Sequence, residues 1–226
     1  MCSRYNLTSP LEAVRAYFRV ANGEPFPPRY NIAPTQPVLI VRLDHARARE
    51  LALVRWGLIP SWAKDPARLP LLINARAESA AEKASFRGAM RHRRCLVPAN
   101  GFYEWTGKPG ARQPHLVRPR DGGLMAFAGL WESWLGADGS EIDTMAILTV
   151  PANEAIALLH DRMPAILLPE HFDAWLDTRD FSAEMAAEML RPAPDGLLEH
   201  VAVNPRLNNA RNEGPDLIEP LRETLL

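Results

Sequence analysis

The stretch Arg94–Trp105, with the sequence RCLVPANGFYEW, is the part of the chain that most clearly predicts its fold. Arg94–Val97 and Gly101–Trp105 are rich in apolar and aromatic residues, and Pro98-Ala99-Asn100 between them is typical of a turn, so the stretch predicts two strands. Similar strand-like runs lie on both sides, at Val38–Leu43, Leu51–Trp56, His115–Arg118, Met125–Leu130, Met145–Val150 and His200–Val203.

Predicted helices lie between and around these runs. Ser9-Pro10-Leu11-Glu12 has the form of a capping box with proline at the first helical position, and it predicts a helix from Leu11 to about Val20. Further helices are predicted at residues 79–90, 153–160, 169–176 and 182–190. Many short strands with a few helices predict an α+β fold, a single domain over residues 1–226 with a mixed, largely antiparallel, barrel-like β core and peripheral helices.

The composition is that of a globular protein: of 226 residues, 47% are hydrophobic and 23% are charged. A membrane span is not expected, because no run of 18 apolar residues occurs. The N-terminal residues lack the apolar segment of an export signal. The two cysteines, Cys2 and Cys95, form no disulfide framework, so we expect a protein of the reducing cytoplasm.

Charge is divided unevenly along the chain. Residues 1–113 hold 15 Arg and 3 Lys against 8 acidic residues, whereas residues 114–226 hold 8 Arg against 19 acidic residues. The halves therefore carry formal charges of +10 and −11. This asymmetry has two interpretations: a positive face that meets a polyanion, or two halves that neutralise each other when they fold together.

Cys2 is the most unusual placement in the sequence. Removal of Met1 would leave an N-terminal cysteine, whose amine and thiol are two carbons apart. An α-amine has a pKa of about 8 and is a better nucleophile at pH 7 than lysine. Such a 1,2-aminothiol can close a thiazolidine ring on an aldehyde, or its thiol can attack an amide. The alternative is an inert residue near a frayed terminus.

Four more residues have functional and structural interpretations. Glu104 is flanked by aromatic residues, and desolvation there would suit it for acid–base chemistry, unless it faces outward. His160 can transfer a proton, or it can be a structural residue at a helix end. Asn74 and Arg76 share a face if the chain is extended, and Glu78 continues that face and could orient Arg76. A loop before a helix is the alternative.

Nucleic-acid contacts are also suggested by aromatic and basic residues. Trp62 follows a Pro-Ser turn and is the indole that we expect to be exposed and to stack on a base, whereas Trp56, Trp131 and Trp134 are predicted core residues. The basic run at residues 91–94 fits a nucleic-acid backbone or a solvated helix end. No histidine or cysteine spacing suits a metal, and no glycine-rich phosphate loop occurs, so we expect no metal and no cofactor.

Seven motifs, in this order, together resemble the SOS-response-associated peptidase (SRAP) family over roughly residues 2–220. The motifs are Met1-Cys2-Ser3-Arg4-Tyr5, Arg29-Tyr30-Asn31-Ile32-Ala33-Pro34-Thr35, Trp56-Gly57-Leu58-Ile59-Pro60-Ser61-Trp62, Asn74-Ala75-Arg76-Ala77-Glu78, Cys95–Trp105, Phe127-Ala128-Gly129-Leu130-Trp131 and His160-Asp161-Arg162-Met163-Pro164.

The resemblance implies the SRAP fold and a sensor and shield of abasic sites in single-stranded DNA. After Met1 removal, Cys2 is expected to form a covalent thiazolidine with the ring-opened sugar. Glu104 is implied as the acid–base residue, His160 as the group that protonates the sugar oxygen, and Asn74 as the group that positions the aldehyde. The implied DNA-binding residues are Arg4, Asn31, Trp62, Arg76 and Arg162.

The resemblance further implies DNA lyase-like activity, possible autopeptidase activity, and a monomer in the cytoplasm, associated with the nucleoid. Its partner would be single-stranded DNA with abasic sites. Two alternatives stay open: an N-terminal thiol peptidase, and a non-covalent binding module for single-stranded or modified DNA. The family usually has glycine after the cysteine, and this chain has Ser3, so we expect a shifted Cys2 amine or a slower reaction.

Overall fold

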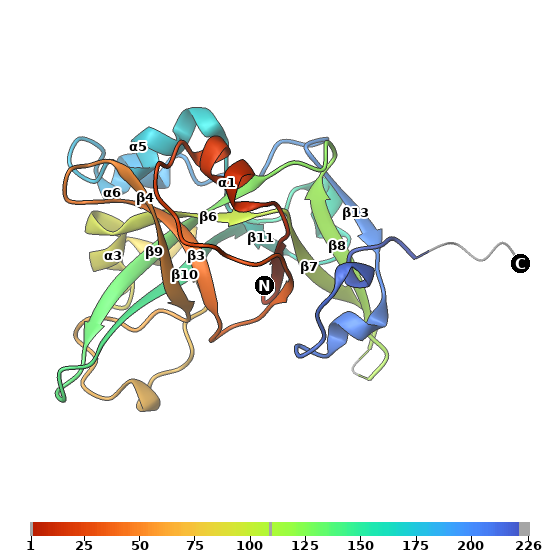
Figure 1. The fold of residues 1–226 in the computed structure, drawn as a ribbon, viewed down its shortest axis with the longest axis horizontal. Coiled ribbons are helices and arrows are strands. Elements are labelled where there is room, and N and C mark those ends of the chain that lie inside the picture. Colours follow the sequence, from red (N-terminus) through yellow and green to blue (C-terminus); the bar gives the residue numbers. More distant parts are fainter. Residues whose placement is uncertain (1, 109, 222–226) are drawn as a thin grey trace, which may run out of the picture.

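The computed structural model of the chain describes residues 2–108 and 110–221. Met1, Pro109 and residues 222–226 lie outside the described residues, and so does the predicted removal of Met1. Within the described ranges the chain forms thirteen strands, six α-helices and four 3-10 turns (Figure 1).

The strands form two sheets. The first sheet has the order β13-β8-β7-β1-β2. The second contains β11, β10, β4, β3, β6, β9 and β12, with β5 added beside β10. The strand bounds are β1 (Tyr5–Leu7), β2 (Arg29–Ile32), β3 (Pro37–Leu43), β4 (Arg49–Trp56), β5 (Asn74–Arg76), β6 (Arg94–Ala99), β7 (Gly101–Thr106), β8 (Gln113–Pro119), β9 (Met125–Leu135), β10 (Glu141–Pro151), β11 (Arg162–Pro164), β12 (Ile166–Leu167) and β13 (Leu198–Ala202).

Five strands of the second sheet close into a barrel. Each of β3, β4, β10, β9 and β6 pairs with the next, and β6 pairs again with β3. Pairing is antiparallel except where β10 runs parallel to β4 and to β5. The structure therefore confirms the predicted α+β fold with a mixed, largely antiparallel, barrel-like core.

β10 is the strand on which the functional region is arranged. It pairs with β9 along most of its length, and near its C-terminal end it pairs with β5 and β11. Ile147 lies opposite Asn74, and Pro151 lies opposite Arg162. The candidate residues Asn74 and Arg162 are therefore both held in register by β10.

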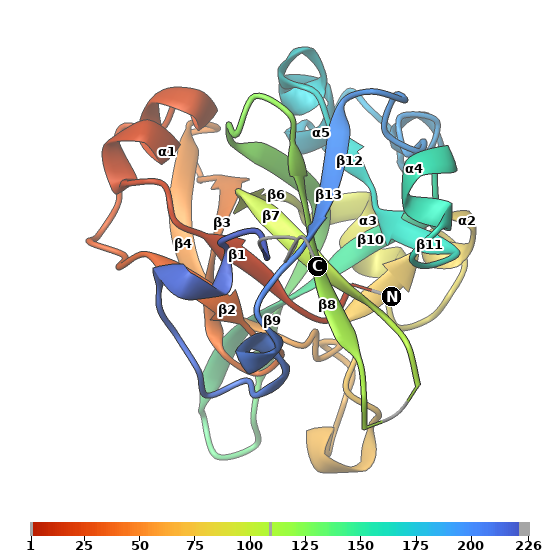
Figure 2. The same ribbon diagram turned by 90° about the vertical axis from the view of Figure 1, so that its right-hand side faces the viewer.

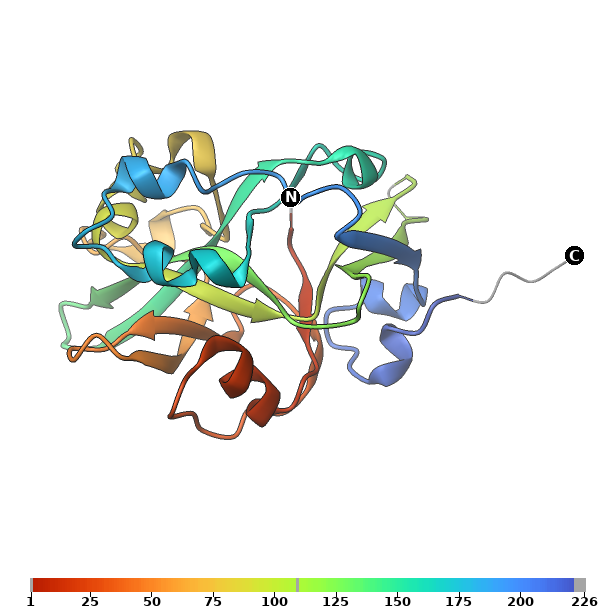
Figure 3. The same cartoon turned by 90° about the horizontal axis from the view of Figure 1, so that it is seen from above.

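The first sheet packs on the barrel through β1. Figure 3 shows β1 running between the barrel and the β7–β8–β13 part of the first sheet, which faces the viewer in Figure 2. The buried Tyr5 ring packs edge-on against Trp56 of β4 and Phe127 of β9, with ring centroids 5.3 and 5.9 Å apart. Phe102 of β7 also contacts Phe127, at 6.0 Å. One aromatic cluster thus joins the two sheets and holds the N-terminal strand.

The helices are short and lie outside the sheets. They are α1 (Leu11–Phe18), α2 (Ala77–Ala80), α3 (Arg87–His92), α4 (Glu154–Ala157), α5 (Phe172–Leu176) and α6 (Ala183–Ala187); the 3-10 turns are at Pro66–Arg68, Pro169–His171, Pro205–Asn208 and Pro215–Leu217. Phe18 of α1 stacks on Phe172 of α5 at 5.4 Å, which packs these two helices together above the barrel (Figure 1).

Two local predictions about helices are wrong. The predicted capping box of α1 does not form, because Pro10 is the N-cap and the Ser9 hydroxyl accepts a hydrogen bond from Asn100 at 2.8 Å. The single helix predicted at residues 79–90 is two helices, α2 and α3, separated by turns. The first difference comes from a tertiary contact, between Ser9 and Asn100, that the local sequence does not encode.

Among the described residues, no helix combines the length and the apolar character that crossing a bilayer requires.

Candidate functional site

Cys2 lies just before β1 and next to β7. Tyr5 is opposite Phe102, and the Tyr103 amide donates to the Arg4 carbonyl at 3.0 Å. Continuing this antiparallel register by two residues brings the chain after Cys2 alongside Glu104. Cys2 is fully buried, and its thiol donates to the Arg4 carbonyl at 3.6 Å. Strand pairing thus fixes the position of the thiol.

Asn74 reaches Cys2 from the barrel. It begins β5, so Asn74–Arg76 has the extended conformation, which was one of the two alternatives that the sequence left open. Its Nδ2 donates to the Cys2 carbonyl at 2.8 Å. Its Oδ1 is buried and has no hydrogen-bond partner among the residues that the structure describes. A buried acceptor without a donor is unfavourable, so this oxygen is suited to a substrate group that brings a hydroxyl or an N–H.

Glu104 is 4% exposed, which answers the question whether it faces inward. Burial raises the pKa of its carboxyl from 4.5 to about 7. Burial also raises the pKa of the Cys2 thiol, and the charge of Glu104 raises it further. Such an effect between two buried groups requires proximity. Glu104 therefore titrates near neutral pH beside a thiol that stays protonated.

His160 lies between α4 and β11. Its Nδ1 accepts the backbone N–H of Arg162 at 2.9 Å and is 2.8 Å from a carboxylate oxygen of Asp161. Desolvation lowers the pKa of His160. The charge of Asp161 adds to the effect of burial in raising the pKa of Glu104, which places the His160 loop near that carboxyl. Three separate segments of chain thus supply a thiol, an acid and an imidazole to one region.

Comparison with known proteins identifies this arrangement. The family model described as "SOS response associated peptidase (SRAP)" matches residues 1–210. The chain belongs to the SRAP family. This confirms the family predicted from the seven motifs.

Relatives of known name align along nearly the whole chain. The chain is 37% identical to abasic site processing protein YoqW of Bacillus subtilis over 97% of its own length and 99% of the relative. It is 32% identical to abasic site processing protein HMCES of Gallus gallus, over 86% of this chain and 66% of the relative.

Solved structures share the fold. A protein from Bacteroides thetaiotaomicron matches with a TM-score of 0.87 at 23% identity, covering 97% of this chain and all of that one. A protein from Bordetella bronchiseptica matches with a TM-score of 0.78 at 28% identity, over 90% of this chain and all of that one. The barrel and the added sheet are therefore the architecture of the SRAP fold.

In this SRAP chain, Arg162 is held by Glu78. The two side chains form a two-pronged ion pair with distances of 2.7 and 2.9 Å, and Arg162 also donates to the Thr149 carbonyl. Arg76 is exposed at the end of β5. The Glu78 carboxylate is thus paired with Arg162, while the charge of Arg76 also helps to lower the pKa of Glu78, so the orientation of Arg76 by Glu78 stays a prediction.

Asn31 is fully buried and belongs to the interior. Its Nδ2 donates to the carbonyls of Leu207, Asn209 and Asn212, and its Oδ1 accepts from Arg4 at 2.7 Å. The side chain is thus fully used in holding Arg4 and the C-terminal segment. This geometry corrects the expectation of a direct DNA contact: Asn31 acts on Arg4 instead.

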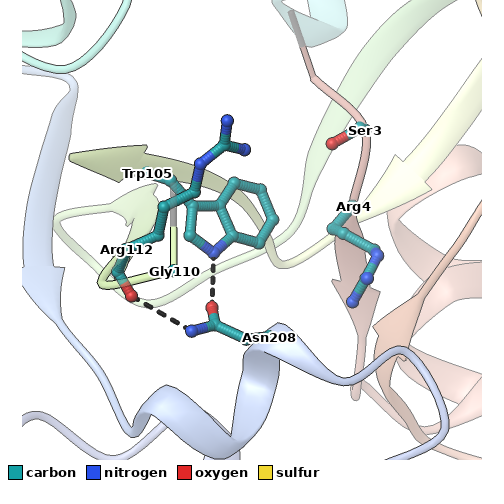
Figure 4. Close-up of a pocket in the computed structure, with 6 residues that line it drawn as sticks. All are labelled: Ser3, Arg4, Trp105, Gly110, Arg112 and Asn208. Atoms are coloured by element: carbon teal, nitrogen blue, oxygen red, sulfur yellow. Dashed lines mark hydrogen bonds between the residues drawn. The ribbon is translucent and has the colours of Figure 1, made fainter. Parts of the chain in front are cut away.

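Arg4 lines a pocket of about 370 Å³ beside the N-terminal strand. Figure 4 shows Arg4, Ser3, Trp105 and Arg112 around it, with the Trp105 indole held by Asn208 at 2.7 Å. Trp105 and Arg112, which line this pocket, were not among the predicted site residues. The alternation along β7 was the available signal, since Trp105 follows Glu104 and must point to the opposite face.

Ser3 adopts an ordinary backbone conformation. Among the described non-glycine residues, positive φ angles occur at Arg19, Thr35 and Arg47. The position after Cys2 therefore requires no glycine conformation in this chain, which removes the reason for expecting an altered amine placement.

The remaining predicted surface residues separate into exposed and buried ones. Trp62 is 56% exposed, as expected, and its indole donates to the Ala84 carbonyl at 3.1 Å. The basic run at residues 91–94 is not one surface: Arg94 is buried against five backbone carbonyls, and Arg93 pairs with Glu132 at 2.6 Å. Trp56 is buried as predicted, whereas Trp131 and Trp134 are only partly buried.

No group of three or more potential metal ligands occurs in residues 2–108 and 110–221.

Proposed function

We propose that this chain senses and processes abasic sites in single-stranded DNA by forming a covalent thiazolidine through Cys2 once Met1 has been removed. The observation that carries the proposal is the convergence of Asn74, Glu104 and the His160 loop on the N-terminal segment at Cys2. The names of the relatives, abasic site processing proteins, support the substrate.

The first step is the opening of the abasic sugar. The hemiacetal hydroxyl gives its proton to the Glu104 carboxylate, the bond from C1′ to the ring oxygen breaks, and the ring oxygen takes a proton from the His160 imidazolium. The products are an aldehyde, a protonated Glu104 and a neutral His160. A carboxyl with a pKa of about 7 suits this exchange, because both of its protonation states are populated at neutral pH.

The second step is capture of the aldehyde. The Cys2 amine adds to the carbonyl carbon and one of its protons moves to the oxygen; the hydroxyl then leaves as water with the proton that Glu104 now holds, which gives a protonated imine and a Glu104 carboxylate. The thiol then adds to the same carbon, and its proton passes to the Glu104 carboxylate. Because burial keeps the Cys2 thiol protonated, a nearby base is needed for this closure. The net reaction joins aldehyde and aminothiol and releases one water.

Contacts with DNA would come from cationic and aromatic groups around the site. Arg76 and Arg162 lie on the strands that flank β10, and Arg4 lines the Trp105 pocket. The exposed Trp62 offers a stacking surface. Such contacts read phosphates and base faces rather than sequence, so binding should depend on salt and tolerate any sequence.

The test uses the full chain after mass spectrometry has established loss of Met1. A single-stranded oligonucleotide with one abasic site is incubated with wild type, Cys2→Ala and Cys95→Ala, and the products are separated on a denaturing gel. Cys95 is the matched control, because it is also buried and free of a disulfide. We expect a shifted band for wild type and Cys95→Ala, none for Cys2→Ala, and an adduct mass equal to both reactants minus one water.

Other outcomes assign other functions. Absence of the wild-type band, or an equal heat-stable band from Cys2→Ala, contradicts the proposal. Salt-dependent binding without an adduct supports the binding module instead. Loss of Met1 that depends on Glu104 supports the thiol autopeptidase.

A further inference from the structure

The Nδ1 atom of His160 has two partners on consecutive residues. The backbone N–H of Arg162 donates to it at 2.9 Å, and a carboxylate oxygen of Asp161 is 2.8 Å away. A neutral ring can accept the Arg162 proton on Nδ1, whereas an imidazolium can only donate from Nδ1. The imidazolium therefore pairs with Asp161, and the neutral tautomer that carries its proton on Nε2 accepts the Arg162 amide.

From this geometry we propose that Asp161 is a positioning residue, which holds the imidazolium form of His160 and so supplies the proton for sugar-ring opening. The inference deepens the proposed function and rests on it. Asp161 itself is 86% exposed, so it acts through His160 and not by contact with the reacting atoms.

The charged groups around His160 make Asp161 the group that favours the cation. Desolvation is the largest effect and lowers the pKa of His160; the charge of Arg162 also lowers it, whereas the charge of Asp161 raises it. Arg162 is largely neutralised by its ion pair with Glu78. Without Asp161, the pKa of His160 would be lower still, and the imidazolium form would be less populated.

Two partners for one nitrogen also keep the ring in place as the proton moves. The Arg162 amide is fixed by the pairing of β11 with β10, where Pro151 lies opposite Arg162. After His160 has given its Nε2 proton, Nδ1 keeps its own proton and still donates to the Asp161 carboxylate, whereas the other neutral tautomer, protonated on Nε2, accepts this amide on Nδ1. The ring is thus oriented in both protonation states.

The test compares Asp161→Asn with two other variants. Asp195→Asn removes the same charge from an exposed loop position and serves as the matched control. Asp161→Glu keeps the carboxylate and should restore the wild-type behaviour. Because Asp161 is exposed, its removal should leave the fold intact, and solvent screening limits the effect to about threefold in the imidazolium population at pH 7.

The first measurement needs no DNA. An NMR titration of the His160 ring, assigned by comparison with His160→Gln, should give a lower pKa in Asp161→Asn than in wild type and Asp195→Asn. Raising the salt concentration should lower the wild-type value toward that of Asp161→Asn. An unchanged His160 pKa in Asp161→Asn overturns the inference.

The second measurement is the rate of crosslinking against pH. Asp161→Asn should react about threefold more slowly at pH 7 and should approach the wild-type rate at lower pH. In a His160→Gln background the same substitution should have no further effect; an equal effect there would show that Asp161 acts through Glu104 and would overturn the inference. A shifted His160 pKa in a wild type that forms no crosslink contradicts the proposed function but leaves the Asp161–His160 pairing supported.

Discussion

Glu104→Gln should make the protein more stable at neutral pH, because the wild-type carboxyl is ionised in a place that disfavours charge. Glu104 is 4% exposed, and burial raises its pKa from 4.5 to about 7. Glutamine keeps the size and the polar character of the side chain but does not ionise. The substitution therefore isolates the energetic consequence of a buried acid.

The sign follows from the proton bound in each state. Below pH 4.5 the carboxyl is protonated in the folded and the unfolded protein, so ionisation does not affect stability. Between pH 4.5 and 7 the unfolded state loses the proton and the folded state keeps it, so the free energy of unfolding falls as pH rises. With about 1.4 kcal/mol for each pH unit, the loss reaches about 3 kcal/mol and is complete above pH 7.

The assay is urea denaturation of both proteins at several pH values from 4.5 to 8. The difference in the free energy of unfolding between Glu104→Gln and wild type should grow by about 3 kcal/mol over this range. Other titrating groups cancel in the difference. Glu24→Gln, which removes one acid from an exposed loop position, is the matched control for the substitution itself. A pH-independent difference for Glu104→Gln would refute the claim that burial governs this carboxyl.

Three further substitutions test the packing and the surface. Arg94→Met should lower the free energy of unfolding by about 3 kcal/mol in urea denaturation, because five backbone carbonyls lose a buried donor. Asn31→Ala should lower it by about 2 kcal/mol and speed amide hydrogen exchange in residues 205–212. Trp62→Ala should change stability by less than about 0.5 kcal/mol and weaken binding to single-stranded DNA, measured by fluorescence anisotropy, by about 1–3 kcal/mol.

Strand content was predictable because alternation and composition are local properties. The runs around Arg94–Trp105 and at Met125–Leu130 all became strands, although β9 and β10 extend further than their apolar parts. Closure of the barrel could not be predicted from these local properties. It depends on the parallel pairing of β10 with β4, where Thr144 lies opposite Arg55, and a sequence does not state which distant strands pair.

In the candidate site, too, local features were predictable from the sequence and long-range contacts were not. The inward orientation of Glu104 could be expected from its aromatic neighbours, and the exposure of Trp62 from the Pro-Ser turn before it. The roles of Asn31 and Glu78 could not, because their partners are 176 and 84 residues away along the chain. Polar side chains of this kind are defined by what folding brings to them.

β10 carries neighbours on both flanks at its C-terminal end, and at its other end it joins β9 through the turn at residues 136–140. A residue inserted within residues 147–151 would shift Asn74 and Arg162 relative to each other, whereas one inserted in that turn would change neither. Insertions and deletions among homologues of this chain should therefore occur at the tip of the β9–β10 hairpin and be rare at the C-terminal end of β10, next to Asn74 and Arg162.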